Sequence, residues 1–162
     1  MRPRVWMVAL ALLGASTVMT SAQEFKSQEF KTPDGGEYVP RLADIMTSAQ
    51  MRHHKLWMAG KAQNWPLAAF ELRLLKASLV EAALLYSNIP VSNVATLDVT
   101  MQSVVDAITE KDGRKFAKTM ADLTEGCNSC HRSIGRNFVV IKVPVDPQPF
   151  GNQVFTPPAG RP

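Results

Sequence analysis

Two cysteines and one histidine form the motif of this chain with the clearest chemical meaning. The run Cys127-Asn128-Ser129-Cys130-His131 contains both cysteines of the sequence. On a helix, Cys127 and Cys130 project from neighbouring turns of one face, so their sulfurs can reach the two vinyl groups of one porphyrin. His131 follows one turn after Cys127, which brings its imidazole to the iron. The spacing predicts one covalently attached haem c, with Cys127 and Cys130 as thioethers and His131 as the proximal axial ligand.

Three other interpretations of the two cysteines fit the sequence less well. A redox-active dithiol usually lies at the start of a helix that follows a strand, and no strand pattern precedes Cys127. A zinc site needs two further ligands, and the remaining histidines, His53 and His54, are adjacent and poorly placed to bind one ion together. A disulfide between Cys127 and Cys130 would close a loop too small to stabilise the fold much. Haem attachment is therefore the favoured interpretation.

The first residues have the pattern of a secretory signal peptide. Arg2 and Arg4 precede an apolar run from Val5 to about Val18, and small residues follow, ending at Ala22. The apolar run is shorter than the roughly 20 residues that span a bilayer, which argues against an uncleaved anchor. We expect cleavage after Ala22 and a periplasmic protein. Residues 23–39 contain a short duplication and a glycine pair, and they predict a flexible leader.

The charge balance argues against a nucleic-acid partner. The whole chain has 18 basic and 14 acidic residues. Removing Arg2 and Arg4 with the signal peptide leaves a formal charge of about +2, and two haem propionates would bring the mature protein close to neutral. A strongly basic surface is therefore not expected.

Apolar residues recur at intervals of three and four through four consecutive segments, which is the period of a helix. The first segment begins at Pro40, and the second begins at an Asn64 cap with Pro66 in its first turn. The third follows Ser92 or Asn93, and the fourth begins beside Asp112. We expect an all-α fold over residues 40–137, an antiparallel four-helix bundle with the haem-binding motif on its last helix. Apolar faces are expected to include Phe70, Leu85 and Val105.

Residues 138–162 are rich in proline, which excludes regular helix. We expect a proline-rich extended C-terminal tail that lies partly on the bundle, with Phe150 and Phe155 as docking points. A mobile tail fits the same composition.

The motif and the helical pattern together resemble the class II c-type cytochromes, the family of cytochrome c′ and its low-spin relatives. The resemblance covers about residues 40–137. It implies a haem within the bundle, with its proximal face held by the last helix and its distal face covered by the first. Members with a methionine on the first helix are six-coordinate electron carriers. Members with an apolar residue there are five-coordinate and bind gases such as NO and CO.

The candidate for the distal ligand is Met46, which lies early in the first helix, where low-spin members of that family have their methionine. His53 is the alternative ligand. It lies on the same stripe about 10 Å further along the axis, so both cannot reach one iron. His53 also fits a hydrogen-bonded core histidine. Met51 and His54 fall away from the stripe, and a distal face without a protein ligand stays open.

Outside the motif, the sequence has no Ser-His-Asp set, phosphate-binding glycine loop or carboxylate pair, so we do not expect an enzyme. The predicted function is that of an exported monohaem c-type cytochrome, a one-electron carrier between exported or membrane-bound redox proteins. The protein would then work close to the membrane surface. A five-coordinate protein that binds NO or CO and a haem subunit of a larger oxidoreductase are the alternatives. The resemblance also leaves room for a homodimer that pairs through the first two helices.

Overall fold

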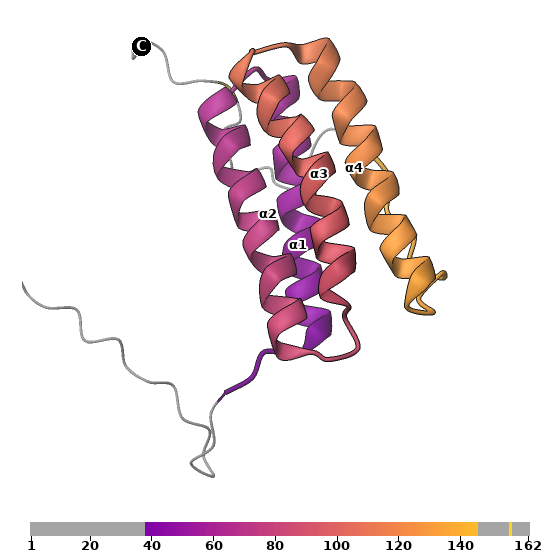
Figure 1. The fold of residues 1–162 in the computed structure, drawn as a ribbon. Coiled ribbons are helices and arrows are strands. Elements are labelled where there is room, and N and C mark those ends of the chain that lie inside the picture. The colour runs from indigo at the N-terminus through magenta and orange to yellow at the C-terminus, as the bar shows by residue number, and fades with distance from the viewer. Residues whose placement is uncertain (1–37, 146–155, 157–162) are drawn as a thin grey trace, which may run out of the picture. The chain divides into compact units, whose positions relative to one another are not determined.

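In the computed structural model, residues 38–145 and residue 156 are described, and from Val39 onward they belong to one compact unit. The described part contains four α-helices and no strand: α1 (Leu42–Lys61), α2 (Trp65–Leu85), α3 (Val91–Thr109) and α4 (Gly113–Ser133). Consecutive helices run antiparallel, so α4 ends at the end of the bundle where α1 begins (Figure 1). The predicted all-α four-helix bundle is confirmed. The predicted signal peptide and residues 23–37 of the predicted leader lie outside the described residues.

Two helices begin at side-chain caps: α2 at the predicted Asn64 cap, and α4 at Asp112, beside which the sequence placed its start. The Asn64 side chain accepts a hydrogen bond from the backbone N–H of Leu67 at 3.3 Å, at the start of α2. Asp112 accepts from the backbone N–H groups of Arg114 and Lys115, both at 2.9 Å, at the start of α4. Those two bonds stabilise the ionised carboxylate and lower the pKa of Asp112. Both caps satisfy N–H groups that have no partner within the helix.

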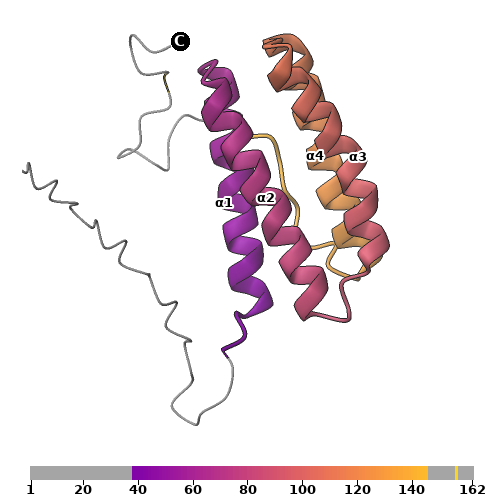
Figure 2. The same ribbon diagram turned by 60° about the vertical axis from the view of Figure 1, so that its left-hand side comes forward.

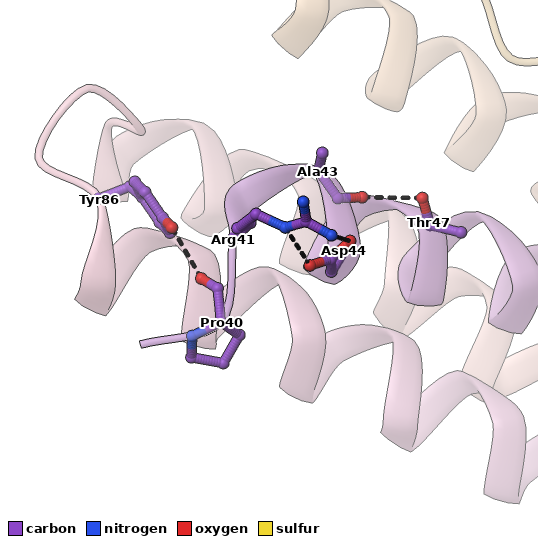
Figure 3. A network of polar contacts seen from close by, with 6 residues as sticks. All are labelled: Pro40, Arg41, Ala43, Asp44, Thr47 and Tyr86. Atoms are coloured by element: carbon purple, nitrogen blue, oxygen red, sulfur yellow. Dashed lines mark hydrogen bonds and ion pairs between the residues drawn. The ribbon is translucent and has the colours of Figure 1, made fainter. Parts of the chain in front are cut away.

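The start of α1 is tied to the end of α2 (Figure 3). The hydroxyl of Tyr86 donates a hydrogen bond to the carbonyl of Pro40 at 2.7 Å. Within the first turn of α1, the Arg41 guanidinium pairs with the Asp44 carboxylate at 2.8 Å. The long-range Tyr86 bond fixes the point at which the chain enters the bundle.

The core is formed by one apolar stripe from each helix. Its fully buried members include Leu56, Leu75, Val104 and Leu123. Phe70, Leu85 and Val105, expected on apolar faces, are instead exposed. The expectation was wrong for these three because a bundle helix buries only the side turned to its neighbours, and wide apolar faces leave their flanks in solvent.

The end of the bundle opposite the haem motif is closed by three aromatic rings. Phe116 of α4 stacks on Trp57 with ring centroids 6.2 Å apart and meets the edge of Trp65 at 5.9 Å. Gly60 of α1 lies directly against Phe116, since a Cβ atom on Gly60 would stand 2.1 Å from Cε1 of that ring. The aromatic ring thus occupies the space that any side chain at residue 60 would need.

One ion pair crosses between α1 and α2 inside the bundle. Nη1 of Arg52 lies 3.1 Å from Oε2 of Glu71, whose side chain is only 2% exposed.

Among the described residues, none of the helices has the length and apolar character needed to cross a membrane.

Candidate haem-attachment site

The C-x-x-C-H motif lies on the last two turns of α4, so its three side chains share one region of the helix surface. Cys127, Cys130 and His131 are all half-buried. Both cysteines are free thiols, and both pack against the apolar core. As predicted, the motif lies on the last helix, and its two cysteines face the core, whereas His131 contacts the chain that follows α4.

The two thiols lie in different surroundings. Burial in the apolar core raises the pKa of Cys127 to about 11, because desolvation disfavours the thiolate, and its proximity to Cys130 adds to the effect. Cys130 instead meets Asn93 at the start of α3, whose Nδ2 lies 3.6 Å from the sulfur and 2.8 Å from Oγ of Ser133. Asn93 therefore braces the end of α4 beside the motif.

The raised pKa of Cys127 predicts slow alkylation in the folded, haem-free chain. Only the thiolate is nucleophilic, so at pH 8 Cys127 should react with iodoacetamide roughly a hundredfold more slowly than an ordinary thiol. The measurement uses Cys130→Ser, which leaves Cys127 as the only thiol, and compares the folded chain with the same chain in urea. The rate in the folded chain should keep rising up to about pH 11. Equal rates in the two conditions would show that Cys127 is not desolvated.

The ring of His131 is oriented by the chain that follows α4. Its Nδ1 lies 2.8 Å from the carbonyl oxygen of Val139. A carbonyl oxygen only accepts hydrogen bonds, so Nδ1 must carry the proton and donate it. In that tautomer Nε2 keeps its lone pair, which is the form of imidazole that binds a metal.

The segment that supplies this carbonyl turns back at the end of α4. Gly135 adopts a φ of 72°, a left-handed conformation that suits glycine. The chain then extends alongside the bundle (Figure 2). The Asn128 side chain holds it through two bonds, one from Nδ2 to the carbonyl of Ile141 at 2.9 Å and one from the N–H of Ile141 to Oδ1 at 2.8 Å. Phe150 and Phe155, the expected docking points, lie outside the described residues.

His53 is buried in the contact between α1 and α4. Its Nε2 lies 2.8 Å from Oγ1 of Thr124, and that hydroxyl donates its own proton to the carbonyl of Met120 at 2.7 Å. The hydroxyl must therefore accept from His53, which fixes the proton of His53 on Nε2. Burial, with a smaller contribution from the charge of His54, lowers the pKa of His53 to about 4, so the ring is neutral at pH 7.

The bond between His53 and Thr124 sets the register of the two antiparallel helices. His131 lies seven residues beyond Thr124 toward the end of α4, and Met46 lies seven residues before His53 toward the start of α1. By helix rise, each is about 10 Å from the bonded pair in the same direction. Met46 thus lies at the same height along the bundle axis as His131, whereas His53 lies at the height of Thr124.

Comparison with family models, with curated proteins and with solved structures found no match. The resemblance to class II c-type cytochromes therefore rests on the motif and the helical pattern.

The Met46 side chain is half-buried, as is His54, while Met51 is exposed.

Four residues in or against the motif were not identified from the sequence as part of the site. They are Asn93, Asn128, Val139 and Ile141. Asn128 lies inside the motif, but its two middle positions carry no requirement of residue type. Val139 acts through its carbonyl oxygen, a group that every residue has.

Proposed function

We propose that this chain is an exported monohaem c-type cytochrome that carries one electron at a time between redox partners. Cys127 and Cys130 would bind one haem c covalently, and His131 would be its proximal ligand. The observation that carries the proposal is the C-x-x-C-H motif on one helix, with Nδ1 of His131 bonded to a carbonyl so that Nε2 is available.

The residues present fit a covalently bound haem. The two sulfurs are free thiols three residues apart, and both lie against apolar side chains, as a porphyrin requires. The imidazole of His131 has a fixed tautomer with a metal-binding nitrogen. Haem would supply the one-electron chemistry by cycling between ferrous and ferric iron.

The chain itself would supply binding, orientation and a dry site. Cys127 and Cys130 tether the group, Asn93 braces the turn that carries Cys130, and the apolar core excludes water from that side. His131 is the proximal ligand, and its orientation follows from the Val139 carbonyl.

Met46 is the residue proposed as the distal ligand. It is level with His131, half-buried, and on the first helix. His53 is less suited to this role because its Nε2 proton is committed to Thr124 and because it lies about 10 Å further along the bundle. A thioether ligand favours ferrous iron and raises the reduction potential relative to a second imidazole.

The proposed partners are exported or membrane-bound redox proteins, and the proposed location is the periplasm. These follow from the signal-peptide pattern of residues 1–22 and from the haem motif. No catalytic group is assigned to the chain.

The optical spectrum of the haem-loaded protein, oxidised and reduced, with and without CO, tests this function. We expect a low-spin reduced spectrum that CO does not change, because Met46 fills the sixth position. Met46→Ala should become high-spin and bind CO, whereas His53→Ala, the matched control on the same helix, should keep the low-spin spectrum. A wild-type protein that is already high-spin and binds CO would contradict the electron carrier and favour a gas-binding function.

A further inference from the structure

Asn128 and His131 are three residues apart on α4, and both are hydrogen-bonded to the same returning segment. His131 meets the carbonyl of Val139, and Asn128 meets both backbone groups of Ile141. Residues three apart on a helix share a face, and residues two apart on an extended chain point to one side. The three bonds therefore join one face of α4 to one edge of the returning segment, and the helix and the segment run in opposite directions.

We propose that Asn128 and residues 139–141 form a clamp whose purpose is to position the axial imidazole of His131. The clamp holds the Val139 carbonyl against Nδ1, so that the ring keeps one tautomer and one orientation. This inference rests on the proposed haem function and adds a positioning residue, Asn128, within the motif itself.

Hydrogen bonds from His131 and Asn128 hold residues 139–141 beside α4. Phe138 is 75% exposed and Val140 is 72% exposed, so their side chains contribute little burial. The Asn128 amide, by contrast, uses one donor and one acceptor on a single residue of the segment, as a neighbouring strand would. A primary amide can do this, whereas a carboxylate or an alkyl side chain cannot.

The clamp has a consequence for the iron. An imidazole that donates Nδ1–H to a carbonyl is a more basic ligand through Nε2, and a more basic ligand stabilises the ferric state. Releasing the Val139 carbonyl should raise the reduction potential. Loss of one such bond corresponds to a change of roughly tenfold in the ferrous-to-ferric ratio at fixed redox poise, which is about 59 mV for one electron.

The test uses the haem-loaded full chain with two variants that break the clamp from opposite sides. Asn128→Ala removes the side chain, and Ile141→Pro removes the N–H that bonds to Oδ1 while tolerating an extended backbone. Each should raise the reduction potential by about the same amount, and the double variant should add little to either single change. Val140→Ala, an exposed neighbour in the same segment, should leave the potential unchanged.

Hydrogen exchange gives a second readout that does not depend on redox chemistry. The Ile141 amide, which donates to Oδ1 of Asn128, should exchange slowly in the wild type and fast in Asn128→Ala. If the wild type binds haem but neither clamp variant changes its reduction potential, or if the Ile141 amide already exchanges freely in the wild type, the clamp is refuted and the haem function stands. A wild type without covalent haem would overturn both.

Discussion

A chain with both Cys127→Ala and Cys130→Ala is expected to carry no covalently bound haem. Each cysteine would supply one thioether, so removing both leaves the haem without a covalent bond to the chain. The chain is exported in a bacterium that matures c-type cytochromes, and haem is detected on the denatured polypeptide. We expect the wild-type band to stain for haem and the double variant to lose the stain completely.

The matched control for that loss is Ser129→Ala, which lies between the two cysteines and is exposed. Its side chain has no role in attachment, so haem content should equal that of the wild type. Each single cysteine variant should retain at most one bond to the haem. Covalent haem in the double variant would show that the group is attached elsewhere.

Gly60→Ala is expected to cause the largest loss of stability among single changes to alanine at the described glycines. The new Cβ would stand 2.1 Å from Cε1 and 2.2 Å from Cζ of Phe116. That ring is 1% exposed and is confined by Trp57 and Trp65, so it has nowhere to move. We expect a decrease of about 2–4 kcal/mol in the free energy of unfolding, even after the better helix propensity of alanine.

Urea unfolding measures this change, and two other glycines give the scale. A Cβ at Gly113 would meet nothing within 4 Å, so Gly113→Ala should be neutral or slightly stabilising. At Gly126 the nearest atom is Cδ2 of Leu97 at 2.6 Å, the tip of a flexible side chain, which predicts an intermediate cost. Equal stabilities for Gly60→Ala and Gly113→Ala would contradict the close packing at the aromatic end.

Much of the fold could be predicted because its determinants are local. Asn64 and Asp112 are side-chain caps that fix where α2 and α4 begin, and both act on residues two or three positions away. The exposure of Phe70 and Val105 could not be predicted. An apolar residue on the flank of a helix looks the same in sequence whether or not a neighbouring helix covers it.

In the candidate site, too, some residues could be identified from the sequence, whereas the contacts between distant parts of the chain could not. Cys127, Cys130 and His131 are identifiable because their chemistry requires these residue types at this spacing. The contacts of His53 with Thr124 and of Asn128 with Ile141 join distant parts of the chain, so they depend on helix register and on the path of the returning segment. The sequence left Met46 and His53 as alternatives, and only the register places one of them level with His131.

The intact mass of the purified, exported chain tests covalent haem attachment most directly. We expect residues 23–162 plus one haem, with the added mass on the proteolytic peptide that contains Cys127, Cys130 and His131. A mass equal to the polypeptide alone, or to the polypeptide with a Cys127–Cys130 disulfide, would contradict the proposal that this protein is a c-type cytochrome.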